Sequence, residues 1–173
     1  MILGINMVAA CEGMAMGEKL GIDPKTLCDI LSVCTANSWV IDTTNPRPGN
    51  KPNAPASKNY EGGFQVGLIR KDLGLAKEIA EQIGADVSFG EKAHDYFEVL
   101  EKNGHGGKDF GYMFQYVMNN LDTKKIWEIT QITFVILKYT NQTIKESLNY
   151  PLKKKDKKRK KWIFHTFGVL GFW

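Results

Sequence analysis

Cysteine is scarce in this chain of 173 residues, and the patterns of a cross-linked or metal-bound fold are absent with it. Cys11, Cys28 and Cys34 make an odd number, and no two of them form a C-x-x-C pair. The spacing argues against a disulfide framework and a zinc knuckle, and it favours a reducing compartment. His94 and His105 have no second ligand at helical spacing, so we expect no metal site.

Long apolar runs are also missing. No stretch of eighteen apolar residues occurs, so we expect no membrane-spanning helix. Hydrophobic residues make up 43% and charged residues 24% of the chain, which is close to the globular average and excludes wholesale disorder. The length suits one globular domain with a real core.

The net charge of +4 is distributed unevenly along the chain. Residues 1–120 carry 11 Lys and Arg against 15 Asp and Glu, whereas residues 121–173 carry 12 against 4. Residues 153–161 hold eight positive charges in nine positions, so we expect residues 121–173 to be a poorly structured basic tail. Binding of the tail to nucleic acid or an anionic membrane stays open, but we favour a solvated tail because this composition cannot bury a core.

Helical periodicity dominates the first 120 residues. It predicts helices over about 1–20, 24–34, 65–83 and 90–102 and a short one after Asp109, with no strand of useful length. Residues 43–63, rich in proline and glycine, predict a long loop or linker. In the helix at 65–83, four apolar residues align on one face: Leu68, Leu75, Ile79 and Ile83. The predicted fold class is all-α, a compact multi-helix domain.

The most informative segment joins paired glycines to a helix that carries two charges. Gly62 and Gly63 free the backbone before the helix, Phe64 at the corner can pack on a planar ligand, and Lys71 and Asp72 follow about two turns later. From these residues alone, a glycine hinge and a solvated Lys–Asp pair is the favoured interpretation, because exposed charges on helices are common.

Several short motifs occur in one order: N-P-x-P-G at 45–49, N-Y-E-G-G-F at 59–64, K-D-L-G-L-A at 71–76, and K-D-F-G at 108–111. Together with E-G-M-A-M-G at 12–17, they strongly resemble the 3-hydroxyisobutyrate dehydrogenases of the β-hydroxyacid dehydrogenase family over residues 1–118. That family combines an N-terminal Rossmann domain with a helical C-terminal domain, as 6-phosphogluconate dehydrogenase-like enzymes do.

The resemblance implies that residues 1–120 are the helical C-terminal domain, that the Rossmann domain is absent, and that residues 121–173 are a non-homologous tail. No G-x-G-x-x-G motif follows a strand. The family's catalytic lysine and asparagine would fall just before Met1, so we assign no catalytic residue here and expect the isolated chain to be inactive.

The resemblance also implies a cofactor and a site. Lys71 matches the family lysine that contacts the nicotinamide cofactor, NAD, while Phe64 and Asp72 match residues of the substrate pocket. The implied activity is NAD-dependent oxidation of 3-hydroxyisobutyrate, a small 3-hydroxyacid, to methylmalonate semialdehyde in valine catabolism. The implied location is the mitochondrial matrix, although the chain shows no targeting peptide, and otherwise the cytoplasm.

A second hypothesis is a non-catalytic helical interaction or dimerisation module with a polyanion- or membrane-binding tail. Such a module would form a homo-oligomer or pair with full-length subunits of the enzyme. Its motivation is an apolar helical body without the catalytic lysine.

Overall fold

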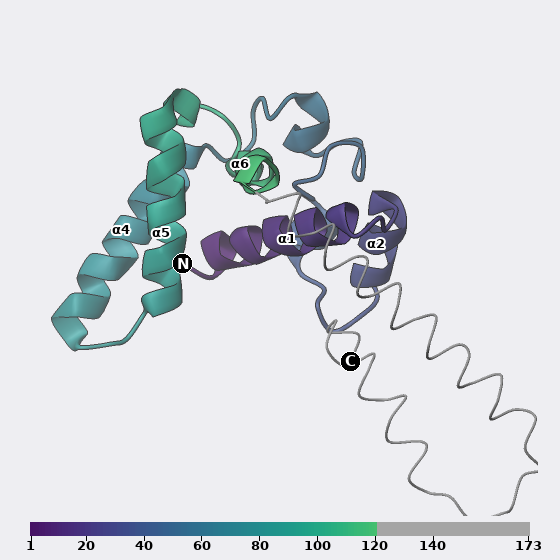
Figure 1. Cartoon of the computed structure of the whole chain (residues 1–173). Helices are drawn as coiled ribbons and strands as arrows, with labels where there is room; N and C mark the ends of the chain where they lie inside the picture. The colour runs from purple at the N-terminus through teal and green to yellow at the C-terminus, as the bar shows by residue number, and fades with distance from the viewer. Residues whose placement is uncertain (121–173) are drawn as a thin grey trace, which may run out of the picture. The chain divides into compact units, whose positions relative to one another are not determined.

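The computed structural model describes residues 1–120, and these form helices joined by turns and one long loop (Figure 1). Within this range there is no β-strand, only an isolated bridge between Gln65 and Asp109. The predicted basic tail, residues 121–173, lies outside the described residues. The α-helices are α1 (Ile2–Lys19), α2 (Pro24–Leu31), α3 (Trp39–Asp42), α4 (Val66–Ile83), α5 (Ser88–Leu100) and α6 (Met113–Asn120). Shorter helical turns are η1 (Pro55–Lys58), η2 (Glu101–His105) and η3 (Phe110–Tyr112).

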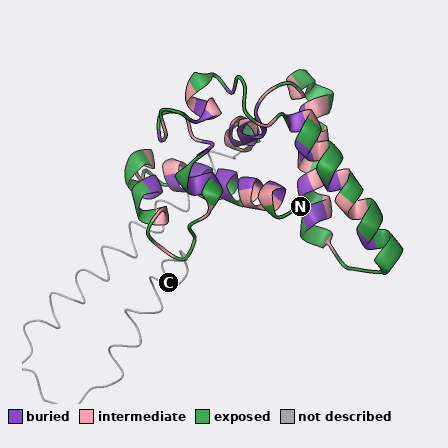
Figure 2. Ribbon diagram, turned by 180° about the vertical axis from the view of Figure 1, so that it is seen from behind, coloured by how far each residue is buried: buried purple, intermediate pink, exposed green. Residues whose placement is uncertain are grey.

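Helix α1 lies at the centre and contacts α2, α3, α5 and α6 (Figure 1). Its side chains Met7, Cys11 and Met14 are fully buried, and the ribbon in Figure 2 marks buried positions along the helix. Burying a side chain of this size contributes about 1.5–3 kcal/mol, so α1 organises the core. In the described part of the chain, no helix has both the length and the apolarity needed to cross a bilayer.

Helix α2 begins as the sequence predicts. The Asp23 carboxylate accepts a hydrogen bond from the Thr26 backbone N–H at 2.8 Å, and Pro24 occupies the first turn. The helix ends at Leu31, three residues before the predicted end, whereas the long helices α1, α4 and α5 match the prediction to within two residues.

The predicted loop at 43–63 is ordered and is held by a buried amide. Asn45 is fully buried; its side-chain N–H groups point to Cys28 Sγ at 3.4 Å, and its Oδ1 accepts the Arg47 backbone N–H at 3.1 Å. The Arg47 guanidinium pairs in two-pronged fashion with Glu18, at 3.0 and 3.2 Å. These contacts fasten the loop to the C-terminal end of α1.

Helices α4 and α5 form a hairpin that stands beside the N-terminal end of α1 (Figure 1). The aligned face of α4 noted in the sequence is the exposed one, because a second stripe packs inward. The inward residues are Val66, Ile69, Leu73 and Ala80, whereas Leu68, Leu75, Ile79 and Ile83 are 45%, 50%, 57% and 72% exposed.

Candidate functional site

The turn at Gly62–Gly63–Phe64 is fixed by a buried carboxylate. Asp109, 1% exposed, accepts hydrogen bonds from the backbone N–H of Phe64 at 3.0 Å and of Gly111 at 2.9 Å. Gly63 has φ +69°, and a Cβ there would collide with the Asp109 carboxylate and lie 2.6 Å from Pro55. The turn therefore needs glycine both for its backbone and for the close approach of Asp109.

Burial raises the pKa of Asp109, and the two backbone N–H donors oppose that rise. The backbone strengthens the same junction, because the Phe110 N–H donates to the Phe64 carbonyl at 2.7 Å. Two segments far apart in the sequence are thus joined just before α4 begins, and this sets the direction in which α4 leaves the turn.

Phe64 is half-buried at that junction. Its ring packs edge-on against Phe110, with ring centres 5.7 Å apart. Lys71 and Asp72 lie seven and eight positions further on, along α4, and form an ion pair with Nζ and Oδ1 3.1 Å apart. The structure therefore brings Lys71 and Asp72 together, while Phe64 packs on Phe110 about two helical turns away.

The Lys71–Asp72 pair faces solvent. The Lys71 side chain is 57% exposed and the Asp72 side chain 46% exposed. An ion pair this exposed contributes little to stability. Its charged groups are instead available to a ligand, and three of the four large apolar residues of the exposed α4 face, Leu68, Leu75 and Ile79, lie within two turns of it.

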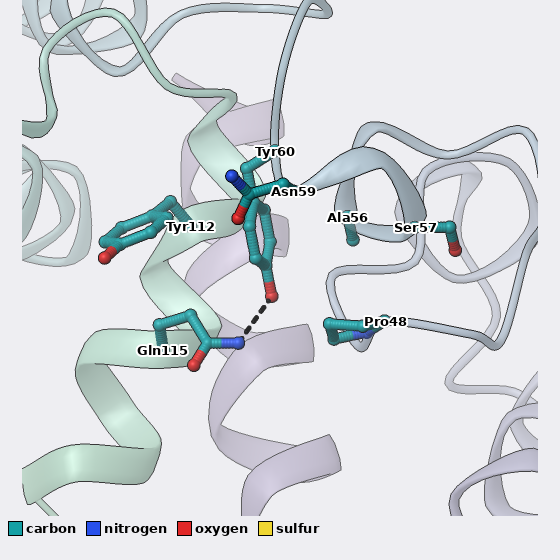
Figure 3. A pocket seen from close by; sticks show the side chains of 7 residues that line it. All are labelled: Pro48, Ala56, Ser57, Asn59, Tyr60, Tyr112 and Gln115. Carbon is teal, nitrogen blue, oxygen red and sulfur yellow. Dashed lines mark hydrogen bonds between the residues drawn. The ribbon is translucent and has the colours of Figure 1, made fainter.

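A pocket of about 440 Å³ is lined by residues of the 43–63 loop, η3 and α6 (Figure 3). Tyr60 forms its wall: the hydroxyl donates to the Pro46 carbonyl at 2.9 Å and accepts from Gln115 Nε2 at 3.1 Å. Burial raises the pKa of Tyr60, so the phenol stays neutral at physiological pH. Asn59 and Tyr60 both have left-handed backbones, with φ +54° and +59°, which are strained conformations for residues other than glycine. The lining residues are Pro48, Ala56, Ser57, Asn59, Tyr60, Tyr112 and Gln115.

Sequence reasoning missed Asp109 and Tyr60 as organising residues, although both belong to the motifs it singled out. A signal was available in the sequence. Both motifs, N-Y-E-G-G-F and K-D-F-G, place an acidic and an aromatic residue within two positions of a glycine. In residues 1–120, no cluster of three or more His, Cys, Asp or Glu side chains could hold a metal ion.

Comparisons with known proteins agree on one family. Residues 1–117 match a family model described as the NAD-binding part of NADP-dependent 3-hydroxyisobutyrate dehydrogenase. The probable mitochondrial 3-hydroxyisobutyrate dehydrogenase of Dictyostelium discoideum is 40% identical over 120 residues, which are 69% of this chain and 37% of that protein. The mitochondrial enzyme of Rattus norvegicus is 39% identical over 117 residues, 68% of this chain and 35% of that protein.

A solved structure agrees with these matches. The Mycobacterium tuberculosis 3-hydroxyisobutyrate dehydrogenase, in a structure with L-serine, superposes with a TM-score of 0.65 at 31% identity. The superposition covers 67% of this chain and 40% of that one. The chain thus spans little more than a third of the length of the curated relatives it matches.

The family model corrects the fold class that we expected. We expected an all-α C-terminal domain, with the main NAD-binding part in a separate Rossmann domain. The model that matches residues 1–117 is described as NAD-binding, so the match assigns these residues to an NAD-binding domain and not to a helical C-terminal domain. The assignment to a C-terminal domain came from the family resemblance. The helical periodicity beside it reports which faces pack, and it does not report which part of an enzyme holds the cofactor. By the matched family model and the relatives, the chain belongs to the 3-hydroxyisobutyrate dehydrogenase family, whose cofactor is NAD.

Proposed function

We propose that this chain forms part of an NAD-dependent dehydrogenase that oxidises 3-hydroxyisobutyrate to methylmalonate semialdehyde in valine catabolism. The substrate carbon that bears the hydroxyl gives a hydride to NAD, and the hydroxyl loses a proton. The match of residues 1–117 to a family model described as NAD-binding carries the proposal. For a eukaryotic source we place the protein in the mitochondrial matrix, which the names of the Dictyostelium and rat relatives support.

Within this proposal, Lys71 contacts the cofactor. Its ammonium group has three N–H donors, and the ion pair with Asp72 occupies one of them. The remaining donors suit an oxygen of the nicotinamide carboxamide or of a phosphate. The residues therefore fit NAD at one contact, which positions the cofactor along α4.

Phe64 and Asp72 border the substrate pocket. The Asp109 clamp fixes the Phe64 backbone, so its half-buried ring presents a rigid apolar edge beside the start of α4. Asp72 orients the lysine through the 3.1 Å ion pair. Both are positioning residues in this proposal, and no residue of the described range is proposed as the proton acceptor.

We also propose that the 173-residue chain alone does not catalyse the oxidation. Hydride transfer requires cofactor and substrate held against each other with water excluded. Lys71 and Asp72 are about half exposed, which supports a site that needs a second wall. Formation of NADH from 3-hydroxyisobutyrate by the purified chain, followed by absorbance, would contradict this part.

Calorimetric titration of NAD into the full chain tests the role of Lys71. We expect Lys71→Ala to weaken binding about tenfold, the effect of losing one hydrogen bond to a charged group. Lys25→Ala is the matched control, because Lys25 also pairs with an aspartate, Asp29, at 3.2 Å and is similarly exposed. If both variants weaken NAD binding equally, or if neither weakens it, Lys71 does not contact the cofactor.

The second candidate function, a non-catalytic interaction module, is favoured by one observation, an uncovered apolar groove between α1 and α5. The tail that this hypothesis assigns to polyanions or membranes lies outside the described residues.

A further inference from the structure

The pocket drawn in Figure 3, the Tyr60 pocket, has a fixed aromatic corner. Tyr60 and Tyr112 meet edge to face, with ring centres 5.3 Å apart and ring planes at 79°. Tyr60 is 3% exposed and forms the back of the pocket, whereas Tyr112 is half-buried and presents part of its ring. His105 packs on Tyr112 with ring centres 4.3 Å apart, so a second ring holds Tyr112 in place.

The turn that carries Tyr60 is strained, and several contacts maintain the strain. Asn59 and Tyr60 have φ +54° and +59°. The Lys108 ammonium donates to the Asn59 carbonyl at 3.1 Å, and the Asp109 N–H donates to the Tyr60 carbonyl at 2.9 Å. The Tyr60 N–H donates to the Pro55 carbonyl at 2.8 Å. Strain that the surroundings maintain in this way clusters at sites that hold a ligand. Here it places the exposed Asn59 side chain at the rim of the pocket and the Tyr60 ring at the back.

Two carboxamides supply polar contacts in the pocket. Gln115 on α6 donates one N–H of its Nε2 to the Tyr60 hydroxyl and has a second N–H that Tyr60 does not use. The Asn59 carboxamide also carries two N–H donors, so both side chains can donate to a carbonyl oxygen. None of the seven lining residues is Asp, Glu, Lys, Arg or His, so a charged ligand would lose hydration without meeting an opposite charge. The pocket therefore suits an uncharged ligand that carries carbonyl groups and an apolar ring.

A second hollow, of about 360 Å³, adjoins the Tyr60 pocket. The two hollows share Pro48 and Gln115, and the second also includes Met118 and Asn119, which lie one helical turn further along α6. Hollows that follow one another along a helix suit an extended chain better than a single compact molecule.

We propose that the Tyr60 pocket binds an extended, proline-containing segment of another protein. A polyproline II segment has no internal hydrogen bonds, so its carbonyl groups are free to accept N–H groups from Asn59 and Gln115. Its prolyl ring packs against Tyr112, as proline-rich segments pack in aromatic-lined grooves. Such a segment is already extended and gives up little conformational freedom on binding. The proposed contact does not depend on the proposed dehydrogenase activity.

Calorimetric titration of the full chain with acetylated and amidated decaproline tests the pocket. This peptide carries no charge, so the excess of basic residues in 121–173 does not attract it. We expect saturable binding of decaproline and about tenfold weaker binding of a Gly-Ser peptide of the same length. The absence of saturable binding, or equal binding of the two peptides, would overturn the proposal.

A tyrosine substitution locates the contact. Tyr112→Ala should weaken decaproline binding about tenfold, because the prolyl ring loses the face on which it packs. Tyr96→Ala is the matched control and should bind as wild type does. Tyr96 is also half-buried and lies edge-on to another tyrosine, Tyr116, with ring centres 6.2 Å apart, but it belongs to α5 and does not line the pocket. Circular dichroism establishes that each variant keeps its helices. An unchanged affinity in Tyr112→Ala, or an equal loss in Tyr96→Ala, would refute the proposed site.

A substitution at Asn59 tests the carboxamide without disturbing the turn. Asn59→Gly removes the side chain, and glycine adopts φ +54° without strain, so the variant should keep its urea midpoint. It should weaken decaproline binding about threefold to tenfold, the effect of losing one hydrogen bond. Asn53→Gly is the matched control, because Asn53 is exposed in the same loop and does not line the pocket. If Asn59→Gly binds decaproline as tightly as Asn53→Gly does, the proposed contact between the carboxamide and the peptide is wrong.

Discussion

Gly62 and Gly63 offer a direct test of the junction that presents Phe64. Both have left-handed backbones, with φ +73° and +69°, but their surroundings differ. A Cβ added at Gly62 would meet nothing within 4 Å, whereas a Cβ at Gly63 would collide with the Asp109 carboxylate and lie 2.6 Å from Pro55. Gly62→Ala and Gly63→Ala therefore share the backbone cost and differ in the steric cost.

The expected magnitudes follow from these two costs. A left-handed backbone costs an alanine about 1–2 kcal/mol, and alanine returns part of this by restricting the unfolded chain. Gly62→Ala should therefore lower the free energy of unfolding by about 1 kcal/mol. Crowding a packed site adds about 1–3 kcal/mol, so Gly63→Ala should lower it by about 2–4 kcal/mol.

Urea denaturation followed by circular dichroism measures both variants against wild type. Because Gly63→Ala also displaces Asp109, it should weaken NAD binding, whereas Gly62→Ala should leave NAD binding within twofold of wild type. Equal destabilisation by the two substitutions would show that Asp109 does not clamp the turn and would refute the reasoning about the junction.

Variants at three further positions are tested by urea denaturation: Asp109 at the junction, Tyr60 in the pocket wall and Asp23 at the start of α2. Asp109→Ala should cost about 2–4 kcal/mol, because two backbone N–H groups lose their acceptor. Burial raises the pKa of Asp109, so the folded state binds the proton of this carboxyl group more tightly than the unfolded state does. The stability of wild type relative to Asp109→Asn should therefore decline as pH rises above 3.8. A stability difference between the two proteins that stays constant from pH 3 to 7 would contradict this expectation. Tyr60→Phe should cost about 1–3 kcal/mol, since it removes both hydrogen bonds of the buried hydroxyl, and an unchanged midpoint would contradict that. Hydrogen bonds from Thr26 lower the pKa of Asp23, so its stabilisation of α2 is complete above pH 3.8 and is lost as pH falls; Asp23→Ala should lack this acid-sensitive step.

Much of the helical pattern follows from the sequence because its signals are local. Asp23 and Pro24 start α2, and Gly84, with φ +66°, ends α4 where the sequence predicts. The choice of the inward face of α4 does not follow, because that helix has two apolar stripes. Leu73 packs inward because Gly4 of α1 leaves space for it, and this contact between distant segments is invisible to periodicity.

The candidate site was predictable only in part, for the same reason. Lys71 and Asp72 are adjacent in the sequence, so their pairing follows from proximity. The position of Phe64 depends on Asp109, 45 residues away, and periodicity carries no information about such a contact. The Tyr60 pocket likewise needs Pro48 and Gln115 to converge from different segments.

The correction of the fold class also bears on how the cofactor is held. The absence of G-x-G-x-x-G excludes one way of binding a pyrophosphate, at a glycine-rich turn after a strand. It does not exclude contact with a nicotinamide, whose planar ring has apolar faces and whose carboxamide accepts hydrogen bonds. The exposed face of α4 offers both kinds of partner, because Leu68 and Leu75 flank the Lys71–Asp72 pair. For residues 1–120, a match to an NAD-binding family model and a set of helices without strands are therefore compatible, provided that the cofactor lies along a helix face and is closed in by a second surface.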